Sequence, residues 1–119
     1  NPSVVSDQHG RLTFTPELAR AIRHLLDTRA PYGTYNVTGS GAVTSWADVA
    51  RQVFRLAGHD SDRVTAVSTD EYCASTVGPA APRPASSVLD VSKIVSTGFD
   101  PADADETLID YVRLKNITA

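Results

Sequence analysis

Residues 34–58 read TYNVTGSGAVTSWADVARQVFRLAG, and this stretch predicts a strand that leads through a loop into a helix. The strand covers Thr34–Thr38, because β-branched and aromatic residues favour extended backbone. The loop, Gly39–Gly41, contains two glycines. Gly58 ends the helix, since glycine readily adopts the left-handed conformation found just after a helix C-terminus. A strand and a helix in this order indicate an α/β chain.

Two residues, Thr44 and Ser45, compete to cap the start of this helix. With Ser45 as the cap, Asp48 stands three residues later and completes a capping box. The helix then carries one apolar stripe, made by Trp46, Val49, Ala50, Val53 and Ala57. Trp46 is expected to anchor the core or an interface, and a role as a stacking platform is the alternative.

A second helix is predicted upstream of this stretch. Thr15 can accept a hydrogen bond from a first-turn amide, Pro16 suits the first helical position, and Glu17 suits the positive end of the helix dipole. Apolar residues follow at helical spacing, namely Leu18, Ile22, Leu25 and Leu26. Ala30–Gly33 ends this helix, and Val4–Ser6 predicts a short strand near the N-terminus.

Shorter elements are predicted after residue 58. They are a strand at Val64–Val67, a helical turn at Thr69–Tyr72, an extended loop at Ala74–Pro84, a short helix from Asp90 to Ile94 closed by Gly98, and a last helix that follows Asp103 and carries Leu108, Ile109 and Val112. The strands are too few for a free-standing doubly wound sheet. The pattern therefore fits a lobe that packs on another body.

Composition limits the classes of protein to which the chain can belong. Its 119 residues, net charge of −3 and 41% hydrophobic content fit one domain with a single core and about 6,200 Å² of folded surface. The scattered basic residues argue against nucleic-acid binding, and no apolar run approaches the roughly 20 residues that span a bilayer. Cys73, the single cysteine, favours a reducing, cytoplasmic location. The lack of methionine predicts a piece of a longer polypeptide.

Several patterns are interpreted without special chemistry. Tyr111 and Lys115 have the spacing of the catalytic pair of short-chain dehydrogenases, but no G-x-G-x-x-G loop precedes them. They are interpreted as part of an ordinary last helix with a lysine near its negative end. The acidic residues near position 103 lack the glycine and distal glutamate of a calcium loop, and the three histidines match no metal-ligand spacing. The sequons at Asn36 and Asn116 have no meaning in a cytosolic protein.

Two polar stretches are candidate binding segments. Asp7–Thr13 is a polar loop that leads into a helix N-terminus, where an anion or a sugar hydroxyl can be held. In the second stretch, Ala81–Asp90, an arginine stands between two prolines. The stiff backbone there lets the Arg83 guanidinium make paired contacts to a phosphate at little ordering cost.

Three segments also stand in register with a known family. They are VSDQHGRLT at residues 5–13, YNVTGSG at 35–41 followed by TSW at 44–46, and RPASSVLD at 83–90. They resemble the V-x-D-Q-x-G-x-P-T, Y-x-x-T/A-G-x-G with T-S/T-W, and R-P-x-x-S-x-L-D/N segments of dTDP-4-dehydrorhamnose reductases. Leu12 departs from the family proline. The order and spacing hold from about Val4 to Leu114, which is nearly the whole chain.

The resemblance implies one part of a two-part extended short-chain dehydrogenase. In that family an N-terminal Rossmann domain binds NADPH or NADH and carries the catalytic residues, and a smaller C-terminal lobe closes over the nucleotide-sugar. This chain resembles only that lobe, which has helices and a few short strands. Residues 1–15 correspond to the crossover from the Rossmann domain and 16–119 to the lobe proper. The chain would then hold no catalytic or cofactor-binding residue, bind no cofactor, be inactive alone, and expose an apolar face where the Rossmann domain packs.

The intact enzymes of this family reduce dTDP-4-dehydro-L-rhamnose to dTDP-L-rhamnose. By this resemblance, Arg83 is expected to contact the diphosphate of the substrate. Gln8 and Thr13 are expected to line the substrate entrance, and Ser86 and Ser87 to bond backbone or sugar. The implied partners are the dTDP-sugar, the Rossmann domain and a possible second copy of the chain.

Two other functions remain open at this stage. The lobe could belong to a non-catalytic regulatory subunit of the same fold, acting as a protein-interaction surface, or to a reductase for another nucleotide-deoxysugar. Some family members hold a magnesium ion at a dimer interface with an acidic residue near the start of the first helix. Glu17 is the nearest match, but it needs a one-residue shift, and no metal site is predicted.

Overall fold

The structure is a computed structural model that describes residues 1–115. Its elements are, in chain order, β1 (Ser3–Val5), β2 (His9–Gly10), α1 (Thr15–Asp27), β3 (Thr44–Ser45), α2 (Trp46–Leu56), the 3-10 turn η1 (Ser61–Arg63), β4 (Thr65–Val67), α3 (Thr69–Ser75), α4 (Ser92–Val95) and α5 (Ala104–Leu114). These helices and short strands confirm the predicted α/β class. The sequon at Asn116 and the end of the predicted lobe at Ala119 lie outside the described residues. No helix within residues 1–115 is long and apolar enough to cross a membrane.

The strands form two small sheets. β1 pairs in parallel with β4, with Val4 opposite Ala66. β2 pairs antiparallel with β3, with His9 opposite Ser45, and a parallel bridge joins His9 to Ser86 on its other side. The short strands predicted near residues 4 and 64 are therefore confirmed to within one residue.

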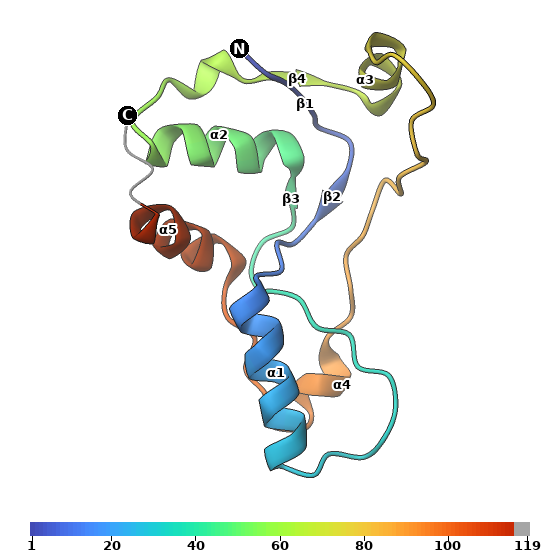
Figure 1. The fold of residues 1–119 in the computed structure, drawn as a ribbon, viewed down its shortest axis with the longest axis vertical. Coiled ribbons are helices and arrows are strands. Elements are labelled where there is room, and N and C mark those ends of the chain that lie inside the picture. The colour runs from blue at the N-terminus through green and yellow to red at the C-terminus, as the bar shows by residue number, and fades with distance from the viewer. Residues whose placement is uncertain (116–119) are drawn as a thin grey trace.

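The elements occupy two regions of the molecule (Figure 1). The sheets lie with α2 and α3 in the upper region of the view, and α1 and α4 lie together in the lower region. α5 lies beside α2, and the two helices are in contact. The chain crosses between the regions after β2, before β3, before α4 and before α5.

The predicted strand at Thr34–Thr38 is wrong, since this segment pairs with no other strand in the described structure. Its side chains nevertheless alternate as a strand's do. Tyr35 and Val37 are half-buried and pack on the core, and Thr34 and Asn36 are exposed. A strand requires hydrogen bonds to a neighbouring backbone as well as suitable residues, and this segment has only the residues.

The predicted capping of α1 by Thr15 is also wrong. The helix follows Phe14, whose backbone is extended and whose side chain makes no capping bond. The Phe14 carbonyl instead accepts from the amides of Glu17 at 3.0 Å and Leu18 at 3.2 Å. Thr15 is thus the first helical residue, and Pro16 follows in the first turn, where its missing N–H costs nothing.

The core of the lower region is small and joins four segments. Ala21, Ile94 and Phe99 are buried there, and Leu25, Tyr35, Val37 and Val91 pack around them. Of the apolar residues predicted for α1, only Leu25 reaches this core. Leu18, Ile22 and Leu26 remain 38%, 60% and 71% exposed. α1 therefore presents apolar side chains to the outside.

The start of α2 follows the capping-box prediction. The Ser45 hydroxyl accepts from the Asp48 amide at 3.2 Å, and the Asp48 carboxylate accepts from the Ser45 amide at 3.4 Å. The Ser45 hydroxyl also donates to that carboxylate at 2.7 Å. These bonds, together with the charge of Arg51, lower the pKa of Asp48 despite the opposing effect of burial. Ser45 rather than Thr44 is therefore the cap.

Replacing Ser45 by alanine should lower the free energy of unfolding by about 1 kcal/mol, because an N-cap hydroxyl is lost where amides need an acceptor. Thr44→Ala is the matched control, and it should leave stability nearly unchanged because Thr44 does not cap the helix. Urea unfolding of the two variants beside the wild type measures the difference. Equal effects would contradict the assignment of the cap.

Candidate functional site

A cavity of about 560 Å³ lies where three segments of the upper region meet. The β2 segment contributes residues 8–12, β3 and the start of α2 contribute residues 44–46 and 49, and the loop before α4 contributes Arg83, Pro84 and Ser87. Three of the predicted substrate residues, Gln8, Arg83 and Ser87, are thereby brought to one cavity.

Backbone hydrogen bonds hold the Arg83 loop against β2. The His9 amide donates to the Ala85 carbonyl at 2.9 Å, and the Ser87 amide donates to the His9 carbonyl at 2.8 Å. The Ser87 hydroxyl donates to the same carbonyl at 3.3 Å. It also lies over Gly10, where a Cβ would come within 2.6 Å of the hydroxyl oxygen. Residues 85–87 thus lie along the β2–β3 pair as a short extended segment. Their hydrogen bonds fix the position of the chain at Arg83, just before this segment.

The cavity wall is basic. Arg11, Arg83 and His9 line it, and none of its lining residues is an aspartate or a glutamate. Arg11 is held in place by a bond from its Nε to the Gly41 carbonyl at 2.8 Å. Arg83 is exposed, and no side chain or backbone group within residues 1–115 pairs with its guanidinium. A cationic wall with an uncommitted guanidinium suits an anionic ligand, above all a phosphate.

A second cavity of about 520 Å³ adjoins the first and shares Gln8, Trp46 and Arg83 with it. The rest of its wall is mainly apolar or aromatic, with Val4, Val5, Tyr72, Cys73, Ala80 and Ala81. Trp46 is 52% exposed between the two cavities, so it does not anchor the core of this chain, and its role as an interface anchor stays a prediction. Its indole lies on the surface because Trp46 is at the start of α2, which lines both cavities. The buried residue at this end of α2 is Ala47.

Gln8 is tied to the start of α3. Its Nε2 donates to the Thr69 hydroxyl at 3.1 Å, and that hydroxyl donates to the Asp7 carboxylate at 2.7 Å. The Thr69 amide also donates to Asp7 at 3.0 Å, and this backbone bond is the main reason that the pKa of Asp7 lies below its ordinary value. Asp7 and Gln8 therefore tie the chain between β1 and β2 to the start of α3.

The other two predicted substrate residues, Thr13 and Ser86, are not among the residues that line these cavities. The Thr13 hydroxyl lies 2.8 Å from the hydroxyl of Thr38, which is buried. The Ser86 hydroxyl accepts from the Val88 amide at 3.5 Å, and Ser86 bridges to His9 through its backbone. Neither residue lines either cavity, and their contact with substrate stays a prediction.

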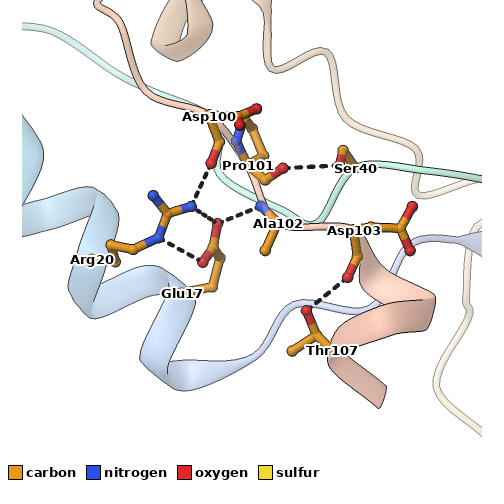
Figure 2. A network of polar contacts seen from close by, with 8 residues as sticks. All are labelled: Glu17, Arg20, Ser40, Asp100, Pro101, Ala102, Asp103 and Thr107. Carbon is orange, nitrogen blue, oxygen red and sulfur yellow. Dashed lines mark hydrogen bonds and ion pairs between the residues drawn. The ribbon is translucent and has the colours of Figure 1, made fainter. Parts of the chain in front are cut away.

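Glu17 belongs to a polar network that joins α1 to the chain before α5 (Figure 2). Its carboxylate accepts from Arg20 at 2.7 and 3.0 Å and from the Ala102 amide at 2.9 Å. Arg20 also bonds the Asp100 carbonyl and lies over the Phe99 ring at 4.3 Å. Ser40 donates to the Pro101 carbonyl at 2.9 Å from the other side. Three hydrogen bonds thus tie the Glu17 carboxylate to its own helix and to the chain before α5.

The pKa of Glu17 reflects this network. Burial acts to raise it, since the side chain is only 9% exposed, but the hydrogen bonds from Arg20 and Ala102 and the charge of Arg20 together lower it below its ordinary value. The described residues hold no group of three or more potential metal-ligating side chains. The network therefore serves to join two segments.

The fold and the cavity define the class of this protein as a ligand-binding lobe of α/β type with a basic cleft. The family model described as RmlD substrate binding domain matches residues 2–115, and the chain belongs to this family. The predicted resemblance is thereby confirmed.

Individual relatives agree with the family. A dTDP-4-dehydrorhamnose reductase of Streptomyces griseus is 37% identical over 102 residues, which are 82% of this chain and 32% of the relative. The solved dTDP-4-dehydrorhamnose reductase of Clostridium acetobutylicum aligns with a TM-score of 0.84 and 35% identity, over 97% of this chain and 39% of its own. The Bacillus anthracis reductase, solved with NADP, aligns with a TM-score of 0.78 and 32% identity, over 96% of this chain and 38% of its own. The chain thus spans about a third of the length of the curated relatives that it matches.

Sequence reasoning missed two features of the site. Arg11 lines the cavity although the sequence predicts no role for it, and its position between Gln8 and Thr13 in the predicted binding segment is the available signal. No short stretch of the sequence indicates the apolar second cavity, because its wall comes from segments as far apart as Val4 and Ala81.

Proposed function

We propose that this chain is the substrate-binding lobe of a dTDP-4-dehydrorhamnose reductase that reduces dTDP-4-dehydro-L-rhamnose to dTDP-L-rhamnose. The observation that carries the proposal is the basic cavity at Arg83 and Arg11, which lies within a domain of a family named for substrate binding. Relatives that match this chain are named for the same reaction. Residues 1–15 would form the crossover from a nucleotide-binding domain, and 16–119 the lobe itself.

Each cavity suits one part of a nucleotide-sugar. The guanidinium of Arg83, with Arg11 across the same wall, would bind the diphosphate through charge-assisted hydrogen bonds. Gln8 and Ser87 offer an amide and a hydroxyl to sugar hydroxyls, and the half-exposed Trp46 ring offers an apolar surface beside them. Closing such a lobe over the sugar would exclude water and hold the keto carbon in position. Thr13 and Ser86 remain predicted contacts for the intact protein.

The nicotinamide cofactor does not fit this chain. Gly39 and Gly41 begin a G-x-G pattern, but Thr44 stands where the third glycine of a dinucleotide-binding loop belongs. We therefore place the binding of NADPH or NADH, and the acid that supplies the proton, in the part of the parent enzyme outside this chain. A cytoplasmic location is part of the proposal, because the lone Cys73 thiol is exposed and free, as in a reducing compartment.

The full-length protein that contains this chain should oxidise NADPH or NADH when dTDP-4-dehydro-L-rhamnose is added, and residues 1–119 alone should not. Absorbance at the nicotinamide band follows the reaction, and the sugar product is identified by mass and NMR. If the protein instead turns over a different dTDP-keto-sugar faster, the proposed substrate is wrong but the protein is still a nucleotide-sugar reductase. Binding of another protein without any turnover would favour a regulatory subunit. A homodimer is decided by sedimentation of the same preparation.

A further inference from the structure

An uncharged apolar segment follows α3 at the edge of the molecule (Figure 1). Residues 77–82 read VGPAAP, and all six are exposed to solvent. Val77, which has the largest apolar side chain among them, is fully exposed. Runs of about four or more exposed apolar residues are avoided on protein surfaces unless they serve a function. This run therefore requires an explanation that the fold alone does not supply.

The segment is tied to the fold only at its two ends. Before it, the Thr76 amide and hydroxyl donate to the Cys73 carbonyl at 3.3 and 3.0 Å. After it, the Ala85 carbonyl accepts from the His9 amide at 2.9 Å. Between these points residues 77–84, here called the strap, make no backbone hydrogen bond within residues 1–115. A solvent-exposed backbone without such bonds moves at little cost in free energy.

The strap combines a pivot with a stiff arm. Gly78 has a φ of 107°, which residues with a side chain rarely adopt, and a Cβ there would meet no atom within 4 Å. Three prolines, Pro79, Pro82 and Pro84, fix their own φ and keep the residue before each of them out of helical conformation. A stiff arm beside an unobstructed pivot is the construction of a loop that closes over a ligand.

The strap also forms part of the wall of the second cavity. Ala80, Ala81 and Arg83 line this cavity, whereas Val77 and Gly78 do not. The rest of the wall comes from β1, Gln8, α2 and α3, and the strand and helices are held by their own backbone hydrogen bonds. A movement of the strap therefore opens or closes the cavity while the rest of the wall stays in place.

We propose that residues 77–84 form a lid over the second cavity, which is open in the unliganded protein and closes when a nucleoside diphosphate occupies the two adjoining cavities. Closing takes the apolar run, Val77 included, out of water. Burial of apolar surface drives this step, because nothing within residues 1–115 covers the run in the open form. Arg83 lines both cavities at one end of the strap, so a ligand that it binds lies beside the lid.

This inference rests on the proposed function only in the choice of ligand. A lid adds exclusion of water to the binding of the diphosphate, and the charge-assisted bonds of Arg83 are stronger where water is excluded. The competing explanation is that another part of the longer polypeptide covers the apolar run permanently. Protease sensitivity of the strap with and without ligand distinguishes the two.

Limited proteolysis of the full-length protein with elastase, which cuts after small apolar residues, tests the lid. Mass spectrometry separates cleavage at Val77–Gly78 from cleavage at Ala80–Ala81, and calorimetry confirms saturation with dTDP. The ligand should slow cleavage at both bonds at least about tenfold. Protection of Ala80–Ala81 alone would mean that dTDP merely covers the cavity wall, and would overturn the lid. Equal rates with and without dTDP, bonds already protected without it, or no binding of dTDP would overturn it as well.

A pair of variants tests whether Val77 leaves water on closing. Val77→Thr keeps the branched shape but places a hydroxyl in an apolar contact, so the Kd of dTDP should rise about threefold to tenfold. Val77→Ile is the matched control, and its Kd should stay within about twofold of the wild type because it remains apolar. The melting temperature without ligand should not change in either variant, since Val77 is exposed there. An unchanged Kd in Val77→Thr would overturn the burial of Val77.

Neither measurement uses turnover, so the lid and the proposed function can fail separately. Protection by dTDP in a protein that does not oxidise NADPH or NADH with the keto-sugar would keep the lid and reject the reductase. Turnover in a protein whose strap is cut equally fast with and without dTDP would keep the reductase and reject the lid.

Discussion

Replacing Arg83 by alanine in the full-length protein is expected to lower kcat/KM for the dTDP-sugar by about tenfold to a hundredfold. A charge-assisted hydrogen bond contributes roughly 1.5–3 kcal/mol, and a guanidinium can make two such bonds to a diphosphate. Most of the effect should appear as a higher KM, because the diphosphate is bound before the keto group reacts and afterwards. The melting temperature should stay unchanged, since Arg83 is exposed and pairs with no group in the described residues.

Two further variants make the Arg83 test specific. Arg55→Ala removes an exposed arginine from the last turn of α2, which lines neither cavity, and should leave kcat/KM unchanged. Arg83→Lys keeps the charge but loses the paired geometry of the guanidinium. Its kcat/KM should therefore lie between those of the wild type and Arg83→Ala. Unchanged kinetics in Arg83→Ala would reject the diphosphate contact. A loss of folding would make Arg83 a structural residue.

Replacing Glu17 by alanine should lower the free energy of unfolding by about 2–3 kcal/mol. Removing one partner of a buried ion pair costs about 3–5 kcal/mol, and we expect a smaller loss here because the Arg20 side chain is 49% exposed. The change also leaves the Ala102 amide without its acceptor. Glu17→Gln keeps an acceptor and should cost less. Asp27→Ala, which breaks an exposed ion pair with Arg23 on the same helix, is the control and should cost at most about 0.5 kcal/mol.

The ion pair between Glu17 and Arg20 also predicts a pH dependence of stability. The folded-state pKa of Glu17 lies below its ordinary value of 4.5, so the folded state favours the ionised carboxylate. Its contribution to stability is therefore complete above about pH 4.5 and is lost as the pH falls through the folded-state value. Urea unfolding between pH 3 and pH 7 measures this contribution as the difference between wild type and Glu17→Gln. A difference that does not shrink toward low pH would show that the carboxylate charge does not stabilise the fold.

The local elements were predictable because their causes lie within a few residues of sequence. The capping box at Ser45 and Asp48 spans four residues, and it fixes the start of α2 as expected. Thr15 shows the limit of this reasoning, since a suitable side chain did not become the cap when the Phe14 carbonyl took the first-turn amides. The candidate segments around Gln8 and Arg83 are visible in the sequence for a similar reason, because loop composition is also local.

The site itself required the tertiary structure. Gln8 and Arg83 meet at one cavity because the chain path brings His9 beside Ser86, and no local signal encodes that contact. The same holds for Glu17, whose bond to the Ala102 amide joins residues 85 positions apart. Thr13 and Ser86 have suitable chemistry and positions in sequence, yet the fold directs Thr13 to Thr38 and Ser86 to Val88.

The sequence by itself determined the family, most helix positions and which loops are candidate binding segments, since motifs, caps and apolar spacing act at short range. Only the tertiary structure decided which of those residues share a cavity, that Trp46 faces outward, and that Thr34–Thr38 pairs with no strand among residues 1–115. The physical reason is that residue preference sets the conformation of a segment. Hydrogen bonding and burial depend on what lies beside that segment in space.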